Sequence, residues 1–266
     1  MYRTKESGDS VKMYDSAMTT DLVKRHNTEN RLVRALEGRE FSLEFQPQVK
    51  IGNQGLFAFE ALVRWHHDGS TVPPIEFIPS LESTGRIVEV GRWILQESCR
   101  QTKAWVDAGY DVGISVNISP IQFCDPTFVP YVWAALEQSG LAPERLDLEL
   151  TESLLIHEVN ELAAKLDLIK TTGSRISIDD FGTGYSSLAY LKHLPIDRLK
   201  IDRTFVKEIP ASDDGTIAKS MIMMAKNLGL TVLAEGVETP AQLASLRATV
   251  CVCYQLLLVI CPWSCN

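Results

Sequence analysis

Two adjacent carboxylates follow an apolar strand in the middle of the chain. Residues 176–178 are Ile-Ser-Ile, Asp179 and Asp180 come next, and a loop with the sequence Phe-Gly-Thr-Gly follows. A charged side chain at the end of a strand can reach a metal or a substrate while the strand itself stays buried. This pair therefore marks a candidate site.

The same pattern recurs at five other strand ends. Three apolar runs end in a glutamate, one ends in an asparagine and one carries a lysine; in chain order these residues are Glu60, Asn117, Glu149, Lys200 and Glu235. A single acid at a strand end is more often a helix cap or part of a loop salt bridge, and a single lysine is most often solvated. Their recurrence in successive strand–helix units favours one shared site.

Carboxylate and amide oxygens are hard ligands, and neither cysteine nor histidine occurs at these strand ends. Such a set suits Mg²⁺ or Mn²⁺ rather than zinc. Two ions about 3.5–4 Å apart are the usual arrangement for hydrolysis of a phosphodiester. We expect Asp179 to bridge two ions and Asp180 to bind the second. One way to bring both side chains inward is a break in the strand, which the following loop could supply.

Four further charged residues are candidates for the same chemistry. Lys200 could orient or deprotonate the attacking water. Glu235, with Glu238 three residues later, could complete the outer shell of the second metal. Arg64 lies four residues after Glu60, on the same side of an extended strand, and suits a substrate phosphate. The spacing supports a divalent-metal site without specifying a substrate.

Apolar strands and amphipathic helices alternate from residue 40 onward. Strands are expected at 41–46, 56–65, 112–118, 146–150, 175–180, 198–202 and 231–235, with a last one at 250–255. Helices are expected in a long region that includes 87–105, and at 127–139, 158–172, 186–193, 214–228 and 240–247. Eight strands predict a (β/α)8 barrel, which places its functional groups at the carboxyl ends of the strands. A doubly wound open sheet is the alternative, but it gathers its site at one switch point.

The composition indicates a soluble globular protein, with 45% apolar and 23% charged residues among 266. A net charge of -8 argues against non-specific binding to nucleic-acid polymers. No signal peptide and no apolar run long enough to span a bilayer is evident, so we expect a cytoplasmic protein without a membrane segment in this chain. A membrane-anchored parent protein stays compatible with this sequence.

The motifs closely resemble the EAL-domain family of cyclic di-GMP phosphodiesterases. The family is named after Glu60-Ala61-Leu62, here within Phe-Glu-Ala-Leu-Val-Arg-Trp. Other similar stretches lie at 45–47, 116–119, 149–153, 179–188, 199–202 and 234–239, and the match covers about residues 31 to 255. The resemblance implies a modified TIM (β/α)8 barrel with an antiparallel first strand. It also implies metal-dependent hydrolysis of cyclic di-GMP to linear pGpG in bacterial second-messenger signalling.

The resemblance also implies roles for individual residues. The implied metal ligands agree with those inferred from residue type: Glu60, Asn117, Glu149, Asp179 and Asp180. Lys200 and Glu235 correspond to the groups around the hydrolytic water, and Glu152 to the residue that holds the Asp-Asp loop in its active conformation. Gln255 stands where the family keeps a glutamine near the site. The implied substrate contacts are Gln46, Leu62 and Arg64.

The ends of the chain differ from the central domain, which we expect to span 39–255. Residues 1–15 resemble the closing segment of a GGDEF diguanylate cyclase domain, although a simple N-terminal arm is the alternative, and 16–38 predict a linker helix. A parent protein with an N-terminal GGDEF or sensor domain is therefore expected. Residues 256–266 depart from the family's ending, so the C-terminal end is atypical or truncated, as a frameshift in the gene would make it.

Three functions are compatible with these motifs. The first is the phosphodiesterase, which the intact acids and Lys200 favour. The second is a cyclic di-GMP receptor that binds without turnover, which the altered C-terminus favours, and the third is a scaffold module that acts through protein contacts. The resemblance also implies a homodimer formed through the region around the Asp-Asp loop.

Overall fold

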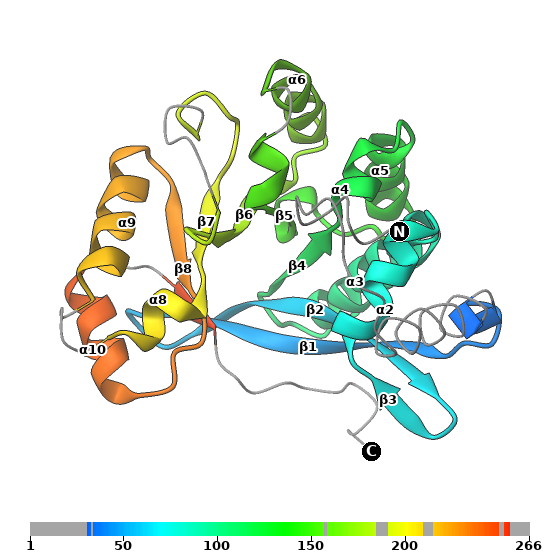
Figure 1. The fold of residues 1–266 in the computed structure, drawn as a ribbon, viewed down its shortest axis with the longest axis horizontal. Coiled ribbons are helices and arrows are strands. Elements are labelled where there is room, and N and C mark those ends of the chain that lie inside the picture. Colours follow the sequence, from blue (N-terminus) through cyan, green and yellow to red (C-terminus); the bar gives the residue numbers. More distant parts are fainter. Residues whose placement is uncertain are drawn as a thin grey trace, which may run out of the picture.

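Eight strands of the described chain close into a barrel (Figure 1). The computed structural model describes residues 31–32, 34–156, 159–184, 191–209, 215–249 and 253–255. The barrel strands are β1 (Phe41–Lys50), β2 (Leu56–His67), β4 (Gly113–Ile118), β5 (Leu146–Thr151), β6 (Arg175–Phe181), β7 (Arg198–Ile201), β8 (Thr231–Ala234) and β9 (Cys253–Gln255). Their order around the barrel is β1-β9-β8-β7-β6-β5-β4-β2, and β1 pairs again with β2. A short strand, β3 (Ser70–Val72), extends β2 outside the barrel.

The first strand runs against its neighbours. β1 is antiparallel to β2 and to β9, whereas the other neighbouring barrel strands are parallel. This confirms the modified (β/α)8 barrel and excludes the open sheet. The expected end of the first strand at Pro47 was wrong, because β1 continues to Lys50. Proline is tolerated at a strand edge, and β1 pairs with β9 only from Gln48 onward.

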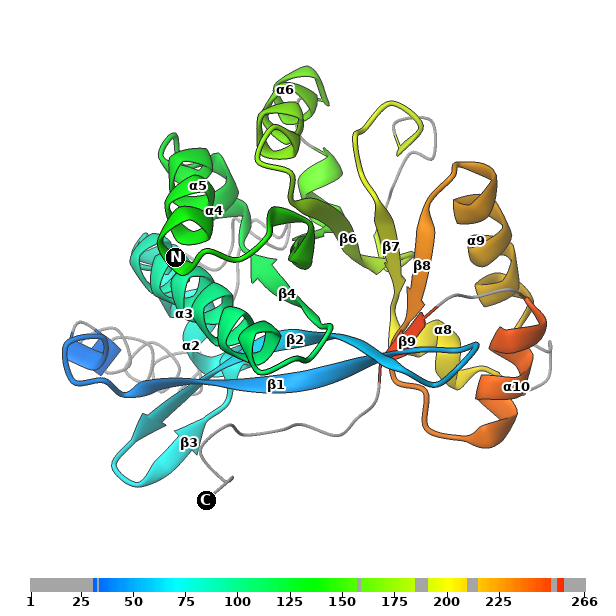
Figure 2. The same ribbon diagram turned by 180° about the vertical axis from the view of Figure 1, so that it is seen from behind.

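Helices surround the barrel on its outside, and Figure 2 shows α9 and α10 on the opposite side from α2, α3 and α5. The described helices are α2 (Pro74–Ser83), α3 (Ile87–Asp107), α4 (Pro120–Cys124), α5 (Phe128–Ser139), α6 (Val159–Lys170), α8 (Arg203–Lys207), α9 (Thr216–Asn227) and α10 (Pro240–Ala248), with 3-10 turns at η2 (Pro143–Arg145) and η3 (Glu152–Ile156). The expected apolar face of α3 is buried. None of the described helices is long and apolar enough to cross a membrane.

Some expectations fall outside the described residues. They are the segment 1–15, most of the linker 16–38, most of the helix expected at 186–193, and the tail 256–266.

Alternation along the strands divides the core into two parts. Outward-facing leucines and isoleucines of the parallel strands are buried between barrel and helices, for example Leu148, Ile176 and Leu199. The residues between them are polar, and many are also buried. Two polar layers result inside the barrel: one toward the carboxyl ends, with Glu60, Glu149, Lys200 and Gln255, and one below it, with Gln48, Ser115, Asp147, Ser177 and Arg198. Hydrophobic side chains usually fill such a barrel, so this interior is arranged for polar contacts.

Candidate metal centre

The ammonium group of Lys200 lies at the centre of the upper polar layer and is fully buried. Its Nζ lies 2.7 Å from Glu149 Oε2, 2.7 Å from Glu235 Oε1, 3.1 Å from Asp179 Oδ1 and 3.4 Å from Glu60 Oε2. Burial lowers the pKa of Lys200, but the four carboxylates reverse this effect and hold its pKa well above the ordinary value. Lys200 is therefore a charged group on which four strands converge.

Glu60 is held by two amides as well as by the lysine. Asn117 Nδ2 donates to its Oε1 at 2.6 Å, and Gln255 Nε2 donates to its Oε2 at 2.5 Å. Burial raises the pKa of Glu60, yet the charge of Lys200 and these hydrogen bonds bring its pKa below the ordinary value. Glu60 is thus ionised, and β9 contributes to its position through Gln255.

Glu149 has one carboxylate oxygen that lacks a protein partner. Its Oε2 accepts from Lys200, whereas its buried Oε1 has no hydrogen-bond partner among the described residues. Burial, followed by the negative charges nearby, raises the pKa of Glu149 well above its ordinary value although Lys200 opposes this. A buried carboxylate oxygen without a partner is costly unless a cation or a proton satisfies it. The residues present therefore fit a divalent cation on this side of the lysine.

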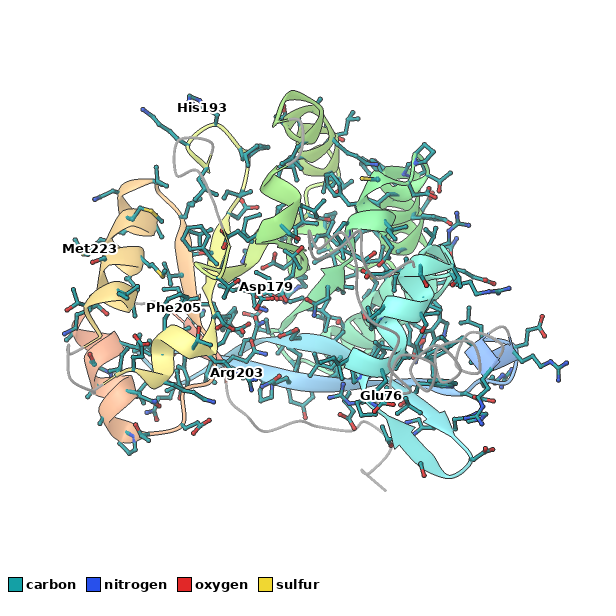
Figure 3. All side chains as sticks on the ribbon, viewed as in Figure 1. Glu76, Asp179, His193, Arg203, Phe205 and Met223 are labelled. Atoms are coloured by element: carbon teal, nitrogen blue, oxygen red, sulfur yellow. The ribbon has the colours of Figure 1, made fainter. Side chains whose placement is uncertain are left out.

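Asp179, Asp180 and Glu235 form a second part of the centre, and Figure 3 shows Asp179 near the middle of the molecule. One carboxylate oxygen from each lies within 4.8 Å of the others. The β6–β7 ladder is irregular between Ile178 and Phe181, and Asp180 has a φ of 54°. The strand β6 is thus irregular, rather than ended, at the two aspartates, whose carboxylates both approach Glu235. Burial raises the pKa of Glu235 to about 7 and raises that of Asp180.

Glu152 lies beneath the loop that follows the two aspartates. Its Oε2 accepts hydrogen bonds from the backbone N–H of Gly182 at 2.7 Å and of Gly184 at 3.3 Å. A Cβ on Gly184 would lie 2.9 Å from Glu152 Oε1, so glycine is required for this close approach. The carboxylate therefore fixes the loop that carries Asp180.

Four candidates from the sequence lie outside this carboxylate cluster. Gln46 lies opposite Glu60 in the β1–β2 ladder, and Leu62 is half-buried two residues further along β2. Arg64 Nε donates to Glu44 Oε2 at 2.6 Å, so its guanidinium is bound on the barrel wall. Glu238 is exposed, and its backbone N–H donates to Gln242 Oε1.

The residues of the lower polar layer were not predicted from the sequence. Asp147 accepts hydrogen bonds from Ser177 Oγ at 2.7 and 2.8 Å, and Arg198 Nη1 lies 2.8 Å from its Oδ2. Asp147 precedes Glu149 by two residues and Arg198 precedes Lys200 by two. Because side chains alternate along a strand, this spacing was the signal that these residues point into the barrel.

Comparison with known proteins agrees with this geometry. The family model described as EAL domain matches residues 29–255. The chain is 41% identical over 246 residues to the bifunctional diguanylate cyclase/cyclic di-GMP phosphodiesterase MucR of Pseudomonas aeruginosa, covering 91% of this chain and 36% of that protein. It is 42% identical over 226 residues to the cyclic di-GMP phosphodiesterase NbdA of the same organism, covering 84% of this chain and 29% of that protein.

Solved structures show the same fold. A structure described as PaMucR phosphodiesterase in a cyclic di-GMP complex superposes with a TM-score of 0.85 at 40% identity, covering 89% of this chain and 98% of that one. The chain spans about a third of the length of the curated relatives it matches. On the family match, these identities and the shared barrel, the chain belongs to the EAL-domain family.

Proposed function

We propose that this chain hydrolyses one phosphodiester bond of cyclic di-GMP and releases linear pGpG. The observation that carries the proposal is the buried Lys200 among four carboxylates at the carboxyl ends of the barrel strands. Relatives named as cyclic di-GMP phosphodiesterases, and a related structure described as a cyclic di-GMP complex, support the choice of substrate.

The proposed metal ligands are the five predicted residues: Glu60, Asn117, Glu149, Asp179 and Asp180. Mg²⁺ or Mn²⁺ suits these oxygen donors, with Glu238 proposed in the outer shell. When bound, two such ions activate a water and stabilise the leaving oxygen. The partnerless Oε1 of Glu149 and the grouping of Asp179 with Asp180 support this ligand set.

The chain's own groups complete the proposed reaction. Lys200 orients the attacking water. Glu235, which forms an ion pair with Lys200 at 2.7 Å, accepts the proton that this water loses. Glu152 keeps the aspartate loop in place through its two backbone hydrogen bonds. Gln255 holds Glu60 at its ligating position. The proposed substrate contacts are Gln46, Leu62 and Arg64.

We also propose the surroundings of this domain. The parts 1–15, 16–38, 39–255 and 256–266 are proposed as a GGDEF remnant, a linker helix, the EAL barrel and an atypical tail. The parent protein would carry an N-terminal GGDEF or sensor domain and act in the cytoplasm as a homodimer. Cyclic di-GMP would be its ligand.

The test is chromatography of cyclic di-GMP incubated with the purified chain and Mg²⁺ or Mn²⁺. We expect linear pGpG with metal and none with EDTA. Lys200→Ala should abolish formation of pGpG. Because this change also leaves four carboxylates without their cation and can unfold the barrel, Asp180→Asn serves as a second variant at an exposed position. Lys226→Ala, an exposed lysine on α9, is the matched control and should retain activity. If the wild-type chain binds cyclic di-GMP but forms no pGpG, the phosphodiesterase proposal is refuted and the receptor hypothesis is supported.

A further inference from the structure

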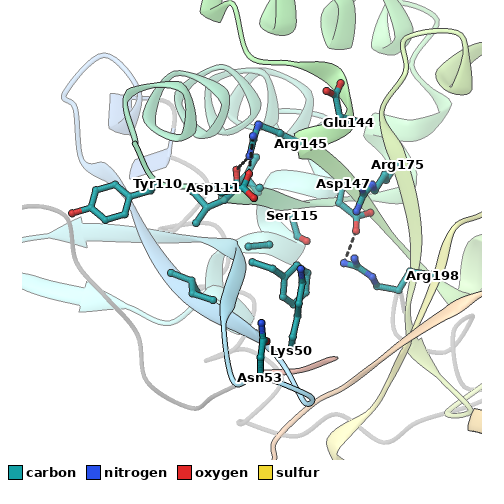
Figure 4. Close-up of a pocket in the computed structure, with 16 residues that line it drawn as sticks. Lys50, Asn53, Tyr110, Asp111, Ser115, Glu144, Arg145, Asp147, Arg175 and Arg198 are labelled. Atoms are coloured by element: carbon teal, nitrogen blue, oxygen red, sulfur yellow. Dashed lines mark hydrogen bonds and ion pairs between the residues drawn. The ribbon is translucent and has the colours of Figure 1, made fainter. Parts of the chain in front are cut away.

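A polar cavity opens at the end of the barrel opposite the carboxylate cluster, where the parallel strands begin (Figure 4). Its volume is about 570 Å³. The turn between β1 and β2 lines one side, and the first residues of β4, β6 and β7 line the others, namely Gly113, Arg175 and Arg198. This floor cavity is separate from the carboxylate cluster, because Lys200 lies two residues further along β7.

Positive charge exceeds negative charge in the floor cavity. Its lining holds four cationic side chains, Lys50, Arg145, Arg175 and Arg198, and three acidic ones, Asp111, Glu144 and Asp147. Two ion pairs form between these groups: Arg145 with Asp111 at 2.8 Å, and Arg198 with Asp147 at 2.8 Å. Within the described residues, Lys50 and Arg175 have no ion-pair partner. Glu144 also lacks an ion-pair partner there, so the lining keeps one net positive charge, which favours an anion.

Three of these cations, which come from different strands, influence the same thiol at the barrel floor. Burial raises the pKa of the Cys253 thiol on β9, and the charges of Arg198, Lys50 and Arg175 all oppose that rise. In Figure 4 the side chains of Lys50 and Arg198 extend toward the same space. The three positive charges therefore all lie within electrostatic reach of this thiol, and Lys50 and Arg198 share one region of the cavity.

Two contacts within the protein fix the orientation of the Arg198 side chain. Asp147 binds its Nη1, and the guanidinium lies over the ring of Phe57 at 5.4 Å from the ring centre. A guanidinium has five N–H donors, so these contacts fix the orientation of the Arg198 side chain and leave some of its N–H groups available to a ligand. Fixed donors lose little entropy when they bind a ligand.

We propose that the floor cavity binds a small phosphate-bearing anion, with Lys50 and Arg175 supplying charge and Arg198 supplying an oriented guanidinium. A phosphomonoester carries about -1.5 to -2 charges near neutral pH, which Lys50 and Arg175 attract, although Glu144 in the lining offsets part of their charge. The volume accommodates a phosphate group with a body of mononucleotide size. The carboxylate end of the barrel would repel the same anion when no metal is present.

Titration calorimetry with the purified chain in EDTA tests this proposal, with inorganic phosphate and adenosine 5′-monophosphate as the two probes. We expect one equivalent of at least one probe to bind. If phosphate binds as tightly as the nucleotide, free phosphate is the source; tighter binding of the nucleotide indicates a phosphorylated metabolite. The double variant K50Q/R175Q should weaken binding by about tenfold or more, because it removes both unpaired charges.

The matched control is R100Q/K226Q, which removes one exposed arginine and one exposed lysine away from the cavity. It should bind the probe as the wild type does. Hydrolysis of cyclic di-GMP by K50Q/R175Q should be unchanged, so that this result is independent of the proposed function. No binding of either probe, or equal binding by both double variants, would overturn the floor site.

Discussion

Glu152 makes its contacts with the backbone of a loop rather than with the proposed substrate. Its carboxylate is buried and accepts from the N–H groups of Gly182 and Gly184. Glu152→Gln replaces one acceptor oxygen by a donor, so the loop with Asp180 should shift. We expect kcat for cyclic di-GMP to fall by about a hundredfold with little change in KM, since small displacements in a site have effects of this size. Steady-state kinetics measures both constants, and Glu144→Gln, at an exposed site, is the control.

Gly184→Ala should reproduce this defect from the other side of the contact. The added Cβ would lie 2.9 Å from Glu152 Oε1, so the carboxylate or the loop must move. Gly52→Ala is the matched control, because a Cβ there meets nothing within 4 Å. The combined Glu152→Gln/Gly184→Ala variant should be no worse than either single variant, since both break one contact. Additive losses in kcat would show that the two residues act separately.

At the residue scale, the sequence predicts that the acids at strand ends share one site, because both the residue types and their positions after apolar runs can be read from it. A break in the strand at the two aspartates was expected, whereas β6 continues to Phe181 with an irregular register there. The pairing of Arg64 with Glu44 was not predicted, since both residues face the same side of a hairpin whose register depends on a turn. The exposure of Glu238 depends on how α10 begins, which the sequence spacing does not define.

At the scale of the elements, the lower polar layer ties β5 to β7 through one buried ion pair. Asp147 and Arg198 are each 7% exposed in this pair. Arg198→Met should lower the free energy of unfolding by about 3–5 kcal/mol, because it leaves Asp147 buried without its charge partner. Arg100→Met removes an exposed pair with Glu97 and should cost about 1 kcal/mol or less. Urea unfolding of both variants would measure the difference, and equal costs would contradict the buried role.

Glu40 joins the two ends of the first hairpin and gives a pH dependence. Its Oε2 accepts from Trp65 Nε1 at 2.8 Å and lies 3.0 Å from His67 Nδ1. The hydrogen bond from Trp65, and then the contacts with His67, lower the pKa of Glu40. A lowered pKa in the folded state means that the stabilisation is complete above the ordinary pKa and is lost as the pH falls through the folded value.

The wild-type chain should therefore lose its stability advantage over Glu40→Gln as the pH falls below the ordinary glutamate range and through the lowered pKa of Glu40. Denaturant unfolding across this range measures the difference between the two proteins. A difference that stayed constant with pH would show that ionisation of Glu40 contributes nothing.

The elements themselves were largely predictable because buried parallel strands are continuous apolar runs and α3 has one apolar face. The strand β1 extends beyond Pro47 because its neighbour on one side is β9, some 200 residues later. No local pattern around Pro47 contains that information.

For the whole molecule, closure of the barrel depends on a short seam between β1 and β9. Three residue pairs form it: Gln48 with Gln255, Val49 with Tyr254 and Lys50 with Cys253. Tyr254→Pro removes a backbone donor from the middle of β9, which pairs with β1 and β8, and should cost about 1–3 kcal/mol through an unsatisfied acceptor. It should also abolish hydrolysis, because Gln255 would no longer hold Glu60. Tyr254→Phe is the control, and both losses are measured by urea unfolding and by pGpG formation.

The barrel was predictable as a whole because eight strands were expected and acids at the ends of four of them favour closure. The antiparallel first strand came from the resemblance, since apolar periodicity is the same for both directions. The floor cavity has no sequence signature, because its cations come from the starts of distant strands and from a hairpin turn.

The β1–β9 seam also has a consequence for how the protein is made. Chains emerge from the ribosome N-terminus first, at about 5–20 residues per second, and domains generally fold as units. Strand β1 is therefore synthesised about 200 residues before the partner that covers its free edge. During this interval the hairpin and the growing half-barrel expose an unpaired strand edge, which is the kind of surface that chaperones protect. Strand β9 both pairs with this edge and brings Gln255 to Glu60, so the barrel gains its proposed activity only after β9 has been translated.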